Sequence, residues 1–119
     1  MKKRISTIII SLLISILPVD LMCLSIGDSF SCKQLKYTMS IETLGVFGGH
    51  VYVYDKVSGR TSIGELKEQG DVLTIKFLNE ERWKMKVLKN GDIKLLKVSE
   101  DGEILNTEKN NIIFKKIRF

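Results

Sequence analysis

The chain has 119 residues, and its 19 Lys and Arg outnumber its 14 Asp and Glu, which gives a formal net charge of +5. This length suits a single domain, and so small a basic excess does not make the footprint of a nucleic-acid-binding protein. With one histidine and two cysteines, the chain is too poor in soft ligands for a structural zinc site. We therefore expect no nucleic acid partner, no metal and no other cofactor.

The first 25 residues have the three regions of a bacterial export signal. Residues 2–4 are cationic, residues 5–17 are apolar apart from Ser and Thr, and a short polar segment follows. The apolar run is shorter than the roughly 20 residues that a membrane-spanning helix needs. We predict that residues 1–25 are cleaved and that residues 26–119 form one β-rich domain, exported to the periplasm, the cell surface or the medium.

Two alternatives to simple cleavage stay open at the N-terminus. Lipidation of Cys23 would make the protein a surface lipoprotein, although Asp20, three positions earlier, departs from the usual lipidation motif. An uncleaved signal would stay in the membrane with Pro18 and Asp20 inside the hydrocarbon region. Contact with a membrane is thus expected only through the signal or a lipid, and a disulfide to Cys32 is open wherever Cys23 is retained.

Beyond the signal, the hydrophobic period is two, which predicts β-strands rather than helices. Glycine, asparagine and aspartate turns divide the region into about eight short strands, an arrangement typical of an antiparallel up-and-down meander. We place these strands at residues 35–43, 51–54, 61–66, 72–78, 82–88, 93–98, 103–107 and 112–117. A meander of this size must curl into a small barrel or a flattened sandwich to bury its apolar face.

Trp83 is expected in the core, because it alternates along its strand with Lys84 and Lys86 and lines up with Phe77 across the hairpin.

The turn at residues 90–91 leaves two registers for the next hairpin. A two-residue loop sets Val87 opposite a lysine, whereas a three-residue loop with a bulge sets it opposite Ile93. The second register keeps more apolar side chains together, so we predict it, and it also places Lys97 beside Trp83.

The strand face opposite Trp83 is rich in cations. Lysines directly opposite one another in a sheet repel, so a face that gathers several of them has a cost in stability that a function would explain. A solvated face that prevents aggregation is one explanation, and a docking surface for an acidic protein or an anionic envelope component is the other. The face comprises Lys76, Arg82, Lys84 and Lys86 with Lys94 or Lys97, partly offset by Glu80, Glu81 and Asp92, and we name Lys76, Lys84 and Lys86 as candidate binding residues.

A second candidate surface is aromatic. Phe47 lies within a glycine-rich segment, and Tyr52 and Tyr54 follow it; the three are candidates for a rim that binds sugar or lipid, with ordinary packing as the alternative. His50 is expected at the surface in a glycine-flanked turn, and no nucleophile motif accompanies it. We therefore predict that the protein is not an enzyme.

Residues 28–38 resemble the opening of small exported bacterial proteins, in which a short first strand begins the mature domain. The size, signal and meander are similar to those of bacterial lipocalin-like domains and periplasmic lysozyme inhibitors, which are small β-barrels, but the Ser/Tyr loop of the inhibitors is absent. We predict a binding or inhibitory domain with a solid core. The alternative is a lipocalin-like carrier of a small apolar ligand, whose cavity would be lined by Tyr37, Met39, Phe77, Trp83 and Met85.

Overall fold

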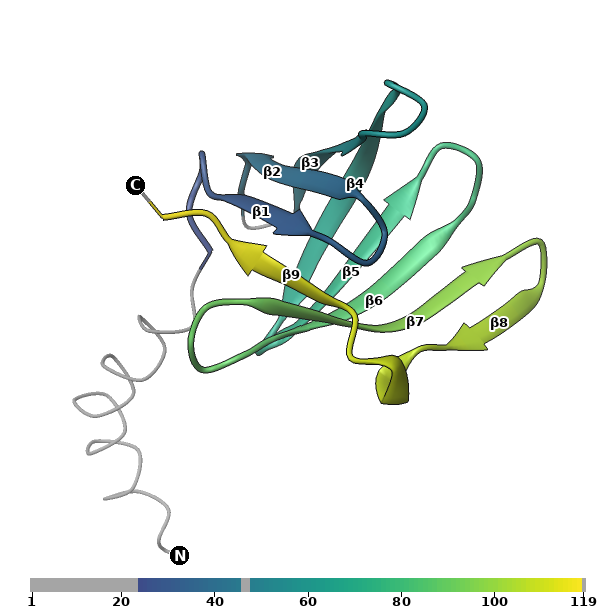
Figure 1. The fold of residues 1–119 in the computed structure, drawn as a ribbon. Helices are drawn as coiled ribbons and strands as arrows, with labels where there is room; N and C mark the ends of the chain where they lie inside the picture. The colour runs from purple at the N-terminus through teal and green to yellow at the C-terminus, as the bar shows by residue number, and fades with distance from the viewer. Residues whose placement is uncertain (1–23, 46–47, 119) are drawn as a thin grey trace, which may run out of the picture.

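The computed structural model describes residues 24–45 and 48–118, which form nine strands and one short 3₁₀-helix (Figure 1). Most of the predicted signal, with Cys23, and the candidate residue Phe47 lie outside the described residues. In the part that is described, no helix is both long enough and apolar enough to cross a membrane. The elements are β1 (Ser29–Cys32), β2 (Tyr37–Thr43), β3 (Gly49–Asp55), β4 (Thr61–Gln69), β5 (Val72–Phe77), β6 (Arg82–Val87), β7 (Ile93–Glu100), β8 (Glu103–Asn106), η1 (Glu108–Asn110) and β9 (Ile113–Lys116).

The strands form an antiparallel meander that closes into an eight-stranded barrel. From β1 to β7 each strand pairs with the next, and β9 then closes the barrel between β1 and β7. Strand β8 pairs with the second half of β7 and projects from the barrel as a hairpin (Figure 1). The all-β antiparallel meander is confirmed, with the difference that β8 lies outside the barrel.

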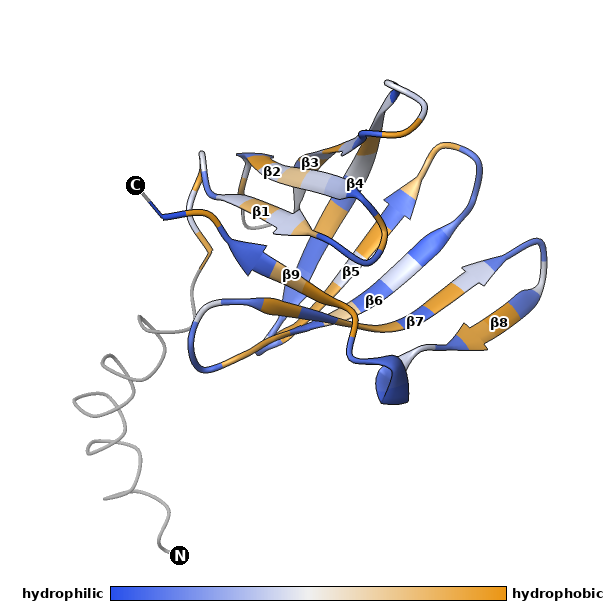
Figure 2. Cartoon of the chain, viewed as in Figure 1, coloured by the Kyte–Doolittle hydropathy of each residue, from blue (hydrophilic) through white to orange (hydrophobic). Residues whose placement is uncertain are grey.

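The barrel interior is filled by its own side chains. Apolar and polar residues alternate along the strands (Figure 2), and the inward set is almost completely shielded from water. Because residues lining an internal cavity would keep surface open to a water molecule, this burial indicates a solid centre. The largest fully buried side chains are those of Phe30, Phe114, Met39, Ile41, Leu66, Leu73, Ile75, Met85, Ile93, Leu95, Val51 and Cys32.

The hairpin of β6 and β7 has the predicted register. Val87 pairs with Ile93 and Met85 with Leu95. Gly91 at the turn has a φ of 92°, a left-handed conformation that glycine adopts without steric cost. Apolar alternation together with this turn residue was therefore enough to choose between the two registers.

One detail of that hairpin was predicted wrongly. Leu96 is an extra residue on β7, so Trp83 pairs with Val98 and Lys97 does not lie beside the indole. The carbonyl of Leu96 accepts a hydrogen bond from the buried Thr107 N–H at 2.9 Å. Thr107 follows β8 in the chain, so the residue that bonds to the bulge is distant from it in sequence. No sequence pattern within β7 predicts the bulge.

Strand boundaries differ from the prediction where polar residues extend a strand. β4 continues to Gln69 rather than ending at Leu66, because its last residues pair with the start of β5 although they carry no apolar signal. His50 lies within β3 and not in a turn, although it is exposed as expected. The short strand β1 matches the first strand implied by the resemblance at residues 28–38, and a turn separates it from β2, which begins at Tyr37.

Candidate functional site

The outer face of β4 to β7 carries three parallel rows of side chains, each formed by direct pairing across the strands. One row is Glu65, Lys76, Arg82 and Ser99, the middle row is Lys67, Thr74, Lys84 and Lys97, and the third is Gln69, Val72, Lys86 and Lys94. We call the basic members the lysine face: Lys67, Lys76, Arg82, Lys84, Lys86, Lys94 and Lys97. The three lysines named from the sequence thus lie on one continuous surface.

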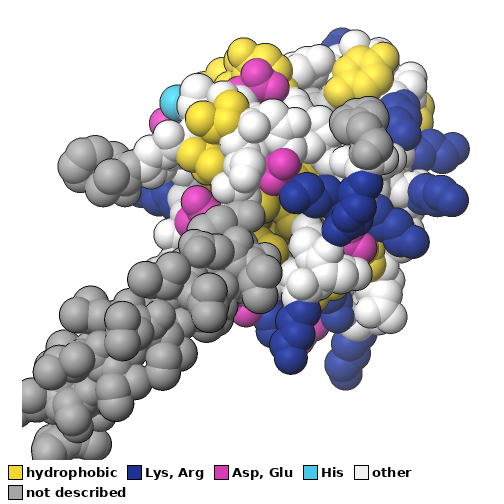
Figure 3. Space-filling model, turned by 90° about the vertical axis from the view of Figure 1, so that its left-hand side faces the viewer, with side chains coloured by type: hydrophobic (Ala, Val, Ile, Leu, Met, Phe, Trp, Pro, Cys, Tyr) yellow, Lys and Arg dark blue, Asp and Glu magenta, His cyan; other side chains and the backbone are white. Residues whose placement is uncertain are grey.

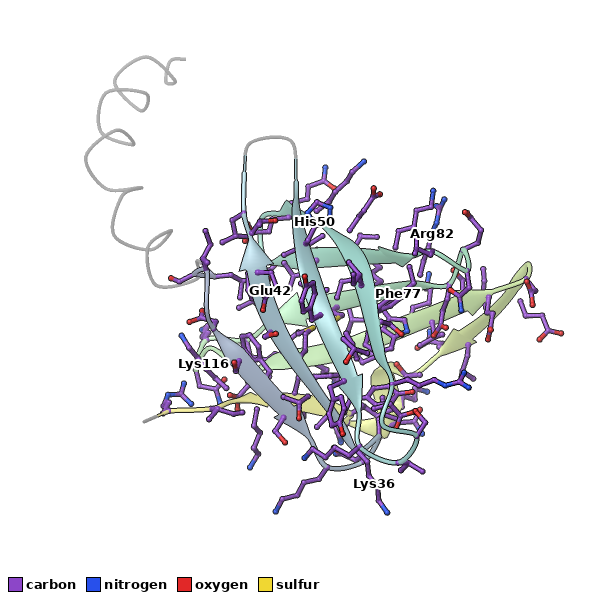
Figure 4. All side chains as sticks on the ribbon, turned by 90° about the horizontal axis from the view of Figure 1, so that it is seen from above. Lys36, Glu42, His50, Phe77, Arg82 and Lys116 are labelled. Carbon is purple, nitrogen blue, oxygen red and sulfur yellow. The ribbon has the colours of Figure 1, made fainter. Side chains whose placement is uncertain are left out.

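Like charges stand directly opposite one another three times on the lysine face. Lys84 faces Lys97, and Lys86 faces Lys94, across β6 and β7. Lys76 faces Arg82 across β5 and β6, and Figure 4 shows Arg82 projecting away from the barrel. Both lysines of the next strand that were offered as alternatives therefore belong to the face.

Acidic neighbours balance only part of this charge. Lys76 forms an ion pair with Glu80 at 3.7 Å, and Lys86 forms one with Asp71 at 3.9 Å. In residues 24–45 and 48–118, no carboxylate oxygen lies within 4.0 Å of an ammonium group of the middle row. Arg82 and Lys94 also lack an ion pair among the described residues, but only in the middle row does every basic side chain keep its charge available to a partner.

The two other acidic residues expected to offset the lysine face have different partners. Glu81 accepts a hydrogen bond from the Trp83 indole, and Asp92 accepts one from the Lys116 N–H at 2.9 Å. Both carboxylates thus form hydrogen bonds at the ends of the barrel and form no ion pair with a side chain of the lysine face. Figure 3, which views the left-hand side of Figure 1, shows Lys and Arg side chains gathered on this side of the molecule as well, with scattered acidic side chains among them, so basic charge is not confined to the lysine face.

The predicted aromatic rim is represented by two exposed tyrosines. Tyr52 and Tyr54 point outward from β3 and are 41% and 43% exposed. Tyr52 lies opposite Ile63 of β4, which is 48% exposed. These residues form a small apolar surface patch, while Phe47 lies outside the described residues, so the binding of sugar or lipid there stays a prediction.

One end of the barrel opens into a cleft of about 590 Å³. Tyr37, Phe77 and Trp83, three of the five residues expected in a carrier cavity, lie in its lining. The other two, Met39 and Met85, are fully buried beneath it and do not contact the cleft. The opening therefore stays at the mouth of the barrel and does not reach its centre.

Trp83 lies in an aromatic cluster at this mouth. It is only 5% exposed, which confirms its predicted place in the core. The Tyr37 ring is stacked on the indole at 5.7 Å between centroids, and the Phe77 ring meets it edge-on at 4.9 Å. The indole Nε1 donates a hydrogen bond to Glu81 Oε2 at 2.7 Å, so the buried polar end of Trp83 is satisfied.

Polar side chains surround the aromatic cluster. Asp55 and Glu81 supply negative charge, Arg60 supplies positive charge, and Asn79 and three hydroxyl residues complete the rim. A hydrogen bond from the Val57 N–H lowers the pKa of Asp55 below its usual range, so this carboxylate is ionised at neutral pH. Burial, followed by the charges of Asp55 and Glu81, raises the pKa of Tyr37.

His50, which sequence reasoning considered for catalysis, and Cys32, which it considered for a disulfide, are not in the lining of this cleft. His50 is exposed on β3, where its Nδ1 lies 3.1 Å from Thr43 Oγ1. Cys32 is a free, fully buried thiol in the core. Among the described side chains, no three His, Cys, Asp or Glu residues are grouped closely enough to hold a metal ion.

Comparisons with protein-family models, with curated proteins and with solved structures found no match. The described side chains and their geometry are therefore the basis on which a function can be proposed.

Proposed function

We propose that the protein is an exported, non-enzymatic binding or inhibitory domain that docks an acidic protein surface through its lysine face. The observation that supports this most is the set of like-charged pairs placed directly opposite one another on β5 to β7. Like charges directly opposite one another destabilise a sheet. A face that served only solubility could alternate positive and negative charges and avoid this cost.

An acidic partner would gain the most favourable electrostatic interaction at the middle row. Its three lysines, Lys67, Lys84 and Lys97, lie on three strands and have no carboxylate within 4.0 Å among the described residues. Opposite charge on a partner would relieve their mutual repulsion in the complex. Such complementary fields raise association rates and make them dependent on salt.

A protein partner fits this face better than a lipid surface. The middle row carries no large exposed apolar side chain. The nearest ones lie at the two ends of the first row: Ile63 is two residues before Glu65 on β4, and Ile104 of β8 lies opposite Ser99. Stable membrane binding combines basic residues with apolar insertion or lipidation. The solid barrel centre likewise supports an outer docking surface over a buried carrier cavity.

A polyglutamate peptide is a suitable probe, measured by amide chemical-shift changes and by binding at several salt concentrations. The middle-row variant carries Lys67→Gln, Lys84→Gln and Lys97→Gln. The control carries Lys33→Gln, Lys109→Gln and Lys115→Gln, which remove the same charge from exposed positions elsewhere.

We expect the parent and the control to bind the peptide through β4 to β7 and the middle-row variant to lose most binding and its salt dependence. Equal binding by all three proteins would refute the proposed face. Binding to phosphatidylglycerol vesicles without binding to the peptide would replace the protein partner with an anionic lipid surface.

Export is part of the same proposal, with cleavage near residue 25 releasing the domain. Its support is the charge and hydropathy pattern of residues 1–25. The intact mass of the protein recovered from producing cells tests it. A mass that includes the first 25 residues, or one with acyl chains on Cys23, would contradict release of a soluble domain.

A further inference from the structure

The cleft at the barrel mouth arises because two hairpins separate. The ladder between β4 and β5 ends at the pair Gly64 and Phe77, so residues 61–63 pair with β3 only. Beyond this point the hairpin of β3 and β4 and that of β5 and β6 form opposite walls (Figures 1 and 4). The cleft is therefore a consequence of strand register and has defined chemistry on each wall.

Each wall carries one carboxylate. Asp55 ends β3, and its Oδ1 accepts a hydrogen bond from the Val57 N–H at 2.8 Å. Glu81 precedes β6, and its Oε2 is held by Trp83. Glu81 Oε1 also accepts a longer hydrogen bond from Asn79 Nδ2 at 3.5 Å. The turn and the indole thus orient the carboxylates at the cleft.

The negative charge of these carboxylates is not cancelled locally. Arg60 lines the same cleft, but neither carboxylate lies within 4.0 Å of a cationic group among the described residues. Both carboxylates act on the Tyr37 hydroxyl, whose pKa they raise in addition to the effect of burial. The mouth is thus an acidic site on a protein whose net charge is positive.

We propose that this cleft binds the positively charged end of a ligand, an alkylammonium or guanidinium group. The half-buried Tyr37 ring and the exposed Leu78 and Ile63 side chains offer apolar surface for an aliphatic stem. Asp55 and Glu81 offer acceptors for the charged head. Aromatic rings beside carboxylates favour organic cations, and the same charges disfavour anionic ligands.

The single tryptophan gives a direct measurement, because Trp83 forms part of the cleft floor. The probe is n-butylammonium chloride, compared with 1-butanol, the neutral analogue, and with sodium chloride at the same ionic strength. We expect only n-butylammonium to change Trp83 fluorescence in a saturable way. No saturable change, or an equal change with 1-butanol, would overturn the proposal.

Charge variants that keep the hydrogen bonds test the carboxylates. Glu81→Gln and Asp55→Asn retain an oxygen acceptor and should each weaken n-butylammonium binding about two- to fivefold. Arg60→Gln should strengthen it by a similar factor, a gain that a folding defect cannot produce. Glu103→Gln on β8 is the matched control and should leave the affinity unchanged. Parent-like affinity in the first three variants would refute the assignment.

A second pair of probes distinguishes the two possible sources of the cation, a side chain of a partner protein and a free amine. A short neutral peptide with one central lysine is compared with the same peptide carrying acetyl-lysine, which has no charge. Tighter binding of the lysine peptide than of n-butylammonium identifies a partner side chain, and the reverse identifies a free amine. The middle-row variant of the lysine face should bind either probe normally, so this site and the proposed docking function can fail independently.

Discussion

Gly64 lies directly opposite Phe77 across β4 and β5, and the Phe77 ring fills the space that a side chain at Gly64 would need. A Cβ atom at this position would lie 3.1 Å from Phe77 Cε1 and would overlap Ile75 Cγ2. Because Phe77 packs edge-on against Trp83, the missing side chain of Gly64 helps to set the floor of the mouth cleft.

Gly64→Ala should therefore destabilise the barrel. Replacing a glycine by alanine at an unstrained strand position stabilises a protein by about 0.4 to 1 kcal/mol, whereas overpacking a core costs about 1 to 3 kcal/mol. The steric cost is larger, so we expect a net loss and a changed Trp83 emission. Urea unfolding gives the free energy, and a stabilised variant would show that Ile75 and Phe77 move aside freely.

Trp83 should be the most sensitive position at this end of the barrel. Trp83→Ala removes a buried ring that contacts Tyr37 and Phe77, and should cost about 3 to 5 kcal/mol. Trp83→Phe keeps an aromatic ring but loses the bond to Glu81, and should cost about 1 to 3 kcal/mol. Unfolding is followed by circular dichroism, since no tryptophan remains. A loss below about 1 kcal/mol for the alanine variant would contradict the packing.

Sequence patterns predicted the local parts of this structure well and the non-local parts poorly. Alternation and turn residues gave the meander, the core position of Trp83 and the pairing of Val87 with Ile93. Closure by β9 between β1 and β7 depends on contacts between distant segments, which strand periodicity does not encode. The bulge at Leu96 has the same origin, because its hydrogen-bond partner is Thr107.

The residues of the two candidate sites show the same difference between local and non-local features. Lys76, Lys84 and Lys86 were found because they alternate with apolar residues on clear strands. Lys67 was missed because the last residues of β4 are polar and gave no strand signal, although the register makes it part of the middle row. Asp55 was missed for a different reason: it reaches the cleft from the end of β3, a position that follows from three-dimensional closure.

The raised pKa of Tyr37 predicts a loss of stability in alkali. The folded protein keeps the Tyr37 proton at pH values at which the unfolded chain, with an ordinary pKa of 10.0, releases it. The folded state then binds more protons, so the free energy of unfolding falls as pH rises above about 10. Tyr37→Phe should remove this component. Urea midpoints between about pH 9 and 11 test it against Tyr54→Phe, and identical curves for parent and Tyr37→Phe would contradict it.

Lys84→Glu should separate stability from binding on the lysine face. The substitution turns the like-charged pair of Lys84 and Lys97 into an opposite-charge pair, and should stabilise the barrel by about 0.2 to 1 kcal/mol at low salt. High salt should reduce this gain, because these side chains are in contact with solvent. The same variant should bind polyglutamate more weakly than the parent.

Lys115→Glu is the matched control for that substitution. It makes the same change in net charge on β9, where the residue opposite is the uncharged Ser31. Its effects on stability and on peptide binding should therefore be much smaller than those of Lys84→Glu. If Lys84→Glu gave no gain in urea unfolding, the opposed lysines would not be in conflict in the folded state. The row would then cost the barrel nothing, and a purely solvated face would explain it as well as a docking surface does.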